Sequence, residues 1–141
     1  MKNTIQPSAA LALMQAGKAI ITLESQKTGV HFTYKIRESQ NKPGWYFCSV
    51  LTGPDNGRDY TYFGSMVDQR FIKTRGSKIS EEAKSVKAFV YTLDNLALGR
   101  TPSVNIYHEG RCCRCGRTLT TPESVSLGIG PECRTRMSAD F

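Results

Sequence analysis

The feature that most constrains this chain is a cluster of four cysteines within its last thirty residues, at positions 112, 113, 115 and 133. A fifth cysteine, Cys48, stands alone. The total is odd, and the first residues contain no convincing secretion signal, so a disulfide framework is not expected. In a reducing compartment such a cluster is typical of a metal site. We therefore expect the C-terminal segment to fold around a metal ion.

The spacing of these cysteines is typical of structural zinc. Cys112 and Cys115 form a C-x2-C pair, and Gly116 follows where the chain must turn tightly. His108 lies four residues before the pair, and Cys133 lies eighteen residues after Cys115. The sequence predicts a closed Cys3His zinc site formed by His108, Cys112, Cys115 and Cys133, with a structural role.

Some ligand assignments stay open at the level of sequence. Cys113 is able to take the first position of the pair, although the resulting C-x-C spacing is less usual for a zinc knuckle. Glu109 or Cys48 is able to replace His108. A lone cysteine in an apolar strand is more often a small buried hydrophobe, which is the favoured interpretation of Cys48.

The third predicted cysteine ligand follows the segment Gly-Ile-Gly-Pro-Glu. Pro131 suits the first turn of a helix, so Cys133 would lie where a helix dipole and a metal both favour the thiolate. Gly128 and Gly130 also resemble the phosphate-binding turn of helix-hairpin-helix modules. A tight turn that delivers Cys133 to the metal is the favoured interpretation.

The residues before this segment predict a sheet. Residues 30–37 alternate between apolar and polar side chains, which is typical of a strand with one buried face and one wet, basic face. A Pro-Asp-Asn-Gly turn joins two further apolar strands. The predicted strands span residues 19–24, 30–37, 45–51, 60–67, 70–74 and 104–107.

Helices are predicted at residues 8–16 and from a Ser80 N-cap, with Glu81 and Glu82 in the first turn, to about residue 97. A helical turn capped by Thr120 or Thr121 is predicted from residue 122. The predicted fold is α+β: a small antiparallel sheet packed by one or two helices, with a C-terminal treble-clef-like zinc knuckle. Residues 1–106 are expected to form an α+β basic domain, and residues 107–141 a zinc-binding appendage docked on it.

The charge of the chain favours polyanionic partners. It carries 19 Lys and Arg against 12 Asp and Glu, a net charge of +7, and residues 1–106 hold 14 of these cations against 8 acids. Such a surplus attracts nucleic acid through counterion release.

The densest group of cations lies between two predicted elements. Four cations occur between residues 70 and 78 with no acid between them, and aromatic residues at 60, 62, 63 and 71 lie nearby. Cations beside aromatic platforms are what single-strand binding requires, although an ordinary solvated face explains them equally well. The predicted nucleic-acid-binding residues are Arg70, Lys73, Arg75, Lys78, Lys84 and Lys87, extended around the knuckle by Arg114 and Arg117.

The cysteine segment also resembles a known family. Residues 108–124 read HxxxCxxCGRxLTxPxS, and residues 128–133 read GIGPxC. This motif resembles a family of uncharacterised domains common in bacteriophage and prophage proteins. Cys113 and Thr121 depart from the small residue and the Asp or Asn expected there. The resemblance implies a zinc site and a phage or prophage origin, but no activity. Since no secretion signal is evident, the expected location is the host bacterial cytoplasm.

No catalytic arrangement is evident: the sequence contains no P-loop, dinucleotide fingerprint or Ser/His/Asp set. The longest apolar run, residues 9–14, is too short to cross a membrane. We expect a non-catalytic, zinc-stabilised phage protein that binds nucleic acid through a basic face. The alternatives are a protein that binds and inhibits or modulates a host enzyme, for example a defence enzyme, and a structural subunit of a phage replication complex. Salt dependence of binding separates the first from the second.

Overall fold

The computed structural model describes residues 3–55, 57–119 and 122–139, with the backbone alone at residues 122 and 136–139. Six strands and four helices occur in these ranges. The strands are β1 (Lys18–Ser25), β2 (His31–Glu38), β3 (Trp45–Leu51), β4 (Tyr60–Val67), β5 (Arg70–Ile72) and β6 (Val104–His108). The helices are α1 (Pro7–Met14), α2 (Lys84–Ala97), α3 (Pro122–Leu127) and α4 (Pro131–Ala139).

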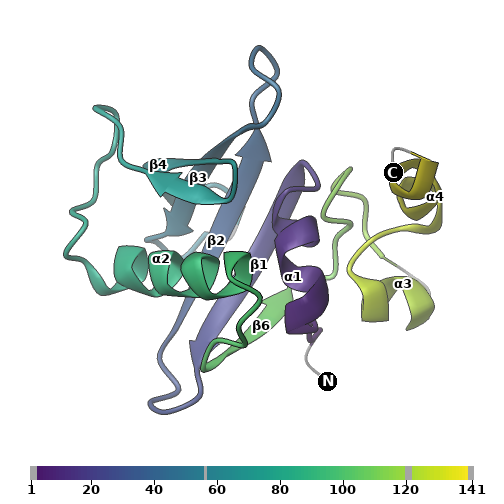
Figure 1. Ribbon diagram of the computed structural model, residues 1–141, viewed down its shortest axis with the longest axis horizontal. Helices are drawn as coiled ribbons and strands as arrows, with labels where there is room; N and C mark the ends of the chain where they lie inside the picture. The colour runs from purple at the N-terminus through teal and green to yellow at the C-terminus, as the bar shows by residue number, and fades with distance from the viewer. Residues whose placement is uncertain (1–2, 56, 120–121, 140–141) are drawn as a thin grey trace.

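All six strands form one antiparallel sheet in the order β5-β4-β3-β2-β1-β6. The first five strands follow one another along the chain. Helix α2 then carries the chain back across the sheet, so that β6 pairs with β1 at the opposite edge (Figure 1). The structure is therefore α+β with an antiparallel sheet, as the sequence predicts.

The core lies between the sheet and the helices α1 and α2, which cover the same face (Figure 1). At its centre the rings of Tyr34, Phe63 and Phe89 lie 5.2 to 5.8 Å apart. The Tyr34 hydroxyl group donates a 2.6 Å hydrogen bond to the Ser85 carbonyl oxygen, and burial raises the pKa of Tyr34. The buried phenol is thereby satisfied, which avoids the cost of an unpaired polar group.

The opposite face of the sheet carries the alternate residues of each strand. On β2, for example, Tyr34 and Ile36 are buried, whereas Lys35 is half-buried and Arg37 is exposed. We call this the open face. Its residues are Lys18, Ile20 and Thr22 of β1, Thr33, Lys35 and Arg37 of β2, Trp45, Phe47 and Ser49 of β3, and Tyr60 and Tyr62 of β4.

The start of α2 differs from the prediction. The helix begins at Lys84, and Ala83 occupies the cap position without a side-chain hydrogen bond. Ser80 instead closes a separate turn, in which its side chain accepts from the Glu82 amide at 3.1 Å and its carbonyl accepts from the Ala83 amide at 3.0 Å. The acids at 81 and 82 therefore precede the helix, because local bonding by Ser80 competes with helix initiation.

Several predicted boundaries also move. Helix α1 ends at Met14, two residues early, and β5 ends at Ile72, whereas β6 extends by one residue to His108. The predicted cap of α3 at Thr120 or Thr121 and the Asn56 position of the predicted hairpin turn lie outside the described residues.

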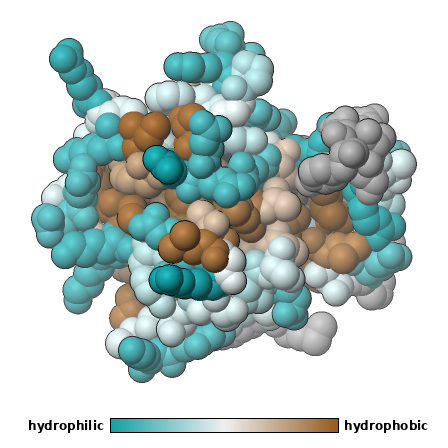
Figure 2. All heavy atoms as spheres, viewed as in Figure 1, coloured by the Kyte–Doolittle hydropathy of each residue, from teal (hydrophilic) through white to brown (hydrophobic). Residues whose placement is uncertain are grey.

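The C-terminal segment packs beside α1 and the β1–β6 edge of the sheet (Figure 1). The Lys18 amide donates to the Cys113 carbonyl oxygen at 2.7 Å, and Cys113 and Ile129 are buried with the apolar core. Figure 2 shows apolar atoms, in brown, continuing from the helix-covered side of the sheet towards the α3–α4 region. These contacts join the segment to the sheet; its status as a separate domain stays a prediction.

Among the described residues, no helix has both the length and the apolar character needed to span a bilayer.

Candidate metal centre

A small hairpin holds the first two cysteines of the centre. Arg111 pairs with Thr118, and the Cys112 amide donates to the Arg117 carbonyl oxygen at 2.8 Å. The Gly116 amide donates back to the Cys112 carbonyl oxygen at 2.9 Å, with Gly116 at φ +81°. Only glycine adopts this left-handed conformation at little cost. The hairpin thus brings Cys112 and Cys115 to the same side of one tight turn.

A second turn delivers Cys133. The Cys113 amide donates to the Gly128 carbonyl oxygen at 3.0 Å, and α4 begins at Pro131, so Cys133 lies in its first turn. Gly128 has φ +71°, and a Cβ atom there would lie 3.3 Å from the His108 ring, so the turn also needs the space that glycine leaves. This arrangement is the predicted tight turn that places Cys133 at the centre.

The three sulfur atoms of Cys112, Cys115 and Cys133 all lie within 4.8 Å of one another. In a tetrahedral zinc site, with zinc–sulfur bonds of about 2.3 Å, ligand sulfurs are separated by about 3.8 Å. A small contraction around an ion therefore brings the three thiolates into bonding range. Three close cysteines of this kind are able to bind a metal ion, and sulfur donors select soft or borderline metals.

The hydrogen bonds around Cys112 favour its charged form. Burial acts to raise the pKa of Cys112, but hydrogen bonds from the backbone amides of Gly130, Cys115 and Arg114 outweigh it, and the pKa is lowered. Amides pointing at a cysteine sulfur are a feature that a thiolate ligand requires. Both the hairpin and the Gly-Ile-Gly-Pro turn contribute one or more of these donors.

Cys133 behaves differently from Cys112. Burial raises its pKa, neighbouring thiols add to the effect, and the Arg114 side chain opposes it. Arg114, predicted to extend a nucleic-acid surface, thus contacts a cysteine of the centre instead. Its positive charge compensates part of the negative charge that three thiolates bring together.

The structure places His108 outside this group. Strand β6 directs its side chain to the buried face of the sheet, opposite Ile21 of β1. Its Nδ1 accepts a hydrogen bond from the Gly110 amide at 2.9 Å, so Nε2 carries the proton and donates to the Val125 carbonyl oxygen at 2.5 Å. Both ring nitrogens are therefore engaged with backbone groups, and His108 connects the sheet edge to α3.

The alternative ligands also lie elsewhere. Cys113 and Cys48 are buried in the apolar core, where burial raises the pKa of Cys113 to about 12 and raises that of Cys48 as well. Glu109 accepts a 3.5 Å hydrogen bond from Thr22 on the open face. Among the described residues, none of these three joins the cysteine group.

A cavity of about 270 Å³ adjoins the three cysteines. Its other lining residues include Thr118, Ser124 and Glu132, and Glu132 lies 3.9 Å from Arg117 in an ion pair. Three protein thiolates leave one corner of a tetrahedral site. Within the described residues, this cavity is the space from which a fourth ligand would reach the ion.

Apart from the half-buried Arg114, the cations predicted to bind nucleic acid are exposed, but several have acidic partners. Lys73 lies 4.0 Å from Glu81, and Lys87 lies 3.1 Å from Glu82. The aromatic residues divide between two faces of the sheet. Phe63 and Phe71 stack on each other in the core at 5.7 Å, whereas Tyr60 and Tyr62 lie on the open face. The exposed cations predicted on and after β5 and on α2 are Arg70, Lys73, Arg75, Lys78, Lys84 and Lys87.

A second group of cations lies on the open face. A cavity of about 510 Å³ is lined by Lys18, Lys35, Arg37 and Arg111, together with Tyr60 and Glu109. No carboxylate lies within 4.0 Å of these four cations in the part of the chain that the structure describes. The alternation along residues 30–37 predicts a basic face, but the sheet order is needed to bring β1, β2 and the hairpin together.

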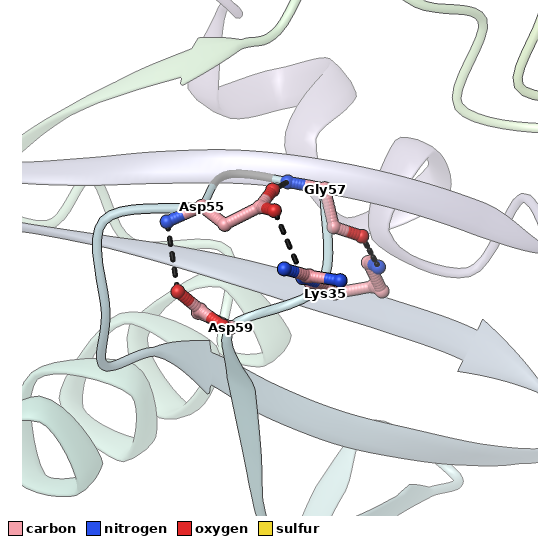
Figure 3. A network of polar contacts seen from close by, with 5 residues as sticks. Lys35, Asp55, Gly57 and Asp59 are labelled. Carbon is pink, nitrogen blue, oxygen red and sulfur yellow. Dashed lines mark hydrogen bonds and ion pairs between the residues drawn. The ribbon is translucent and has the colours of Figure 1, made fainter.

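Lys35 is at the centre of this cavity. Its Nζ lies 4.3 Å from the centre of the Tyr60 ring. It also donates to the Gly57 carbonyl oxygen at 3.4 Å (Figure 3). The loop after β3 is held in place by its own bonds, including those from the Asp55 amide to Asp59 and from the Gly57 amide to Asp55 (Figure 3). Burial, and then the charge of Arg37, lower the pKa of Lys35. The neighbouring cations therefore repel each other, and an anion would relieve that repulsion.

Residues 106–138 match a family described as a family of unknown function (DUF6011). The match spans the end of β6, the hairpin of Cys112 and Cys115, α3 and most of α4, and it does not extend over β1 to β5. No curated protein and no solved structure matches the chain.

Proposed function

We propose that this protein is a non-catalytic, zinc-stabilised nucleic-acid-binding protein that uses a basic surface. The observation that carries the proposal is the cavity on the open face, where four cations lie without a carboxylate partner among the described residues. Unpaired cations gain the most from a phosphate, because no protein anion has to be displaced. The net charge of +7 supports the same class of partner.

The metal in this proposal is zinc, held by Cys112, Cys115 and Cys133. Three thiolates on a divalent ion leave a net charge of about −1, which makes the ion a weak Lewis acid and supports a structural role. A knuckle hairpin followed by a helix that carries the next cysteine supports a treble-clef-like module. His108 joins as a fourth ligand only if its ring leaves Val125 and Gly110.

The phage origin and the host bacterial cytoplasm also remain proposals. They rest on the motif spanning residues 108–133, within the segment that matches the family of unknown function.

The test is a titration of labelled single- and double-stranded oligonucleotides at two salt concentrations, with two matched double variants. Lys35→Gln with Arg37→Gln removes two unpaired cations, whereas Lys73→Gln with Lys87→Gln removes two cations that have acidic partners. The first variant should weaken binding and reduce the salt slope by about two, and the second should change it less. Thermal melts establish that both variants are folded.

Two results would redirect the proposal. If only the Lys73 and Lys87 variant weakens binding, the binding surface is the Arg70–Lys87 region predicted from the sequence. If no oligonucleotide binds at low salt, nucleic-acid binding is wrong, and a protein partner becomes the candidate.

A further inference from the structure

We infer that the ligand of the open face is a single-stranded nucleic acid, whose backbone lies over the cations of β1 and β2 and whose bases stack on the aromatic residues of β3 and β4. This inference rests on the proposed function and specifies its ligand. It depends on the order in which the sheet places two kinds of side chain.

The cations lie next to one another across two strands. Lys18 is the cross-strand partner of Arg37, and Lys35 is the partner of Ile20, so three cations share neighbouring positions on β1 and β2. Arg111, from the knuckle hairpin, lines the same cavity. Adjacent strands are about 4.8 Å apart, so this group presents a continuous strip of positive charge to a phosphate backbone.

The aromatic residues lie on the next two strands. Phe47 of β3 is the cross-strand partner of Arg37 and is 44% exposed, and Trp45 and Tyr62 lie on the same face of the sheet. The Tyr62 ring of β4 lies 6.2 Å from the Phe47 ring at an angle of 68°, so the two rings meet edge to face and do not stack on each other. Trp45 lies two residues along β3 on the same face, with the Lys42 ammonium 4.3 Å from its ring centre.

The cations of β2 and the aromatic residues of β3 lie at paired positions of neighbouring strands. A phosphate held by Arg37 lies beside Phe47, because these residues are paired across β2 and β3. Cations that follow a backbone beside exposed rings are the two elements that single-strand binding combines. In a duplex, the faces of the bases are covered by their neighbours, so Phe47 has no base to stack on. The arrangement therefore favours an unpaired strand.

Glu109 is the one acid that lines this cavity, and its charge raises the pKa of Tyr60 in addition to the effect of burial. Its carboxylate accepts a hydrogen bond from Thr22 of β1, which pairs with Thr33, whereas Arg37 pairs with Lys18 four residues away along β1. A phosphate is therefore expected to bind nearer to Lys18 and Arg37 than to Glu109.

The experiment compares Phe47→Leu with Tyr91→Leu. Both wild-type side chains are 44% exposed, but Tyr91 lies on α2, on the other side of the sheet. Neither substitution changes the charge. Each variant is titrated with a labelled single strand, with the same strand in a duplex, and with heparin as a polyanion without bases. Trp45, the one tryptophan of the chain, supplies a second signal through quenching of its fluorescence by stacked bases.

Phe47→Leu should weaken single-strand binding about fivefold to a hundredfold and leave heparin binding unchanged. Tyr91→Leu should bind the single strand as the wild type does, and the single strand should quench Trp45 more than the duplex does. If Phe47→Leu binds the single strand normally while the Lys35 and Arg37 variant is weakened, the stacking inference is wrong and the proposed function stands. If wild-type protein binds heparin but no oligonucleotide, both are wrong.

Discussion

The sheet and the C-terminal segment achieve their stability by different means. The sheet packs large apolar side chains, such as Tyr34, Phe63 and Phe89, against two helices. The C-terminal segment has two short helices of 6 and 9 residues, and α4 is largely polar. Helices of this length are not stable alone, so they depend on contacts with the rest of the molecule. With the proposed zinc bound, sulfur–metal bonds would supply stability that these short helices do not supply themselves.

The two regions also meet at the open face. The Lys18 amide bonds to Cys113, and the hairpin places Arg111 beside the cations of the sheet. The segment proposed to depend on zinc therefore contributes residues to the lining of the basic cavity. The predictions below test how independent the two regions are, beginning with the largest effect.

The largest effect is expected when a cysteine of the metal centre is replaced. Cys112→Ser should abolish stoichiometric zinc binding and unfold the C-terminal segment, because zinc binding is worth about 10–16 kcal/mol in comparable small modules. Metal analysis and hydrogen exchange by mass spectrometry measure the two consequences. Cys113→Ala is the matched control, since Cys113 is adjacent and equally buried but lies outside the cysteine group, and this variant should keep its zinc. Retention of zinc by Cys112→Ser would contradict the assignment.

A substitution in the core of the sheet is expected to lower the stability of the protein without removing zinc. Phe89→Ala should lower the free energy of unfolding by about 3–5 kcal/mol, because it leaves a cavity between α2 and the sheet. Denaturant unfolding measures the loss. At temperatures where the variant remains folded, its zinc content should equal that of the wild type. Loss of zinc from the folded variant would show that the centre depends on the core directly.

A smaller effect is expected at His108, where the two regions meet. His108→Ala removes a buried side chain that bonds to Val125 and Gly110, which should cost about 1–3 kcal/mol. Zinc should remain at one ion per chain. His31→Ala, at an exposed position on β2, is the control and should have little effect. Complete loss of zinc from His108→Ala would identify this histidine as the fourth ligand, as the sequence predicts.

The smallest effect is expected at Arg111, which the hairpin contributes to the lining of the open-face cavity. Arg111→Gln should reduce the salt slope of nucleic-acid binding by about one, because one phosphate contact is lost. Arg100→Gln, in the exposed loop after α2, removes the same charge elsewhere and should leave the slope unchanged. Equal effects of both variants would mean that only net charge matters.

Much of this arrangement is predictable from sequence, and the exceptions have physical causes. Alternation along residues 30–37 predicts β2 correctly, since one buried face fixes the period of two. The C-x2-C pair and the Gly-Ile-Gly-Pro turn predict three members of the cysteine group. His108 also lies two residues after buried Ile106 on the same face of β6, which favours a buried structural role over the predicted ligand role. The spacing of His108 from the cysteines does not show which face of the sheet His108 occupies, because that depends on the bounds of β6.

The group of cations on the open face is harder to predict, because it depends on contacts between distant parts of the chain. Lys35 and Arg37 are predictable as members of a wet face, but their proximity to Lys18 and Arg111 depends on the pairing of β1 with β2 and on the docking of the hairpin. The prediction from sequence instead selects the cations at positions 70–78, because they are close together along the chain. Two of the wider predicted set, Lys73 and Lys87, have acidic partners from the turn before α2, which only the folded structure brings close.

The most direct test of this account is a nitrogen–proton NMR spectrum of zinc-loaded protein before and after a strong chelator. We predict that one zinc ion per chain is removed. Dispersed signals from residues 106–138 should then collapse, while signals from β1 to β5 and from α2 remain dispersed. A spectrum that is unchanged by chelation, or protein that contains no zinc when purified with zinc present, would contradict the claim that three cysteines and a metal hold the C-terminal segment together.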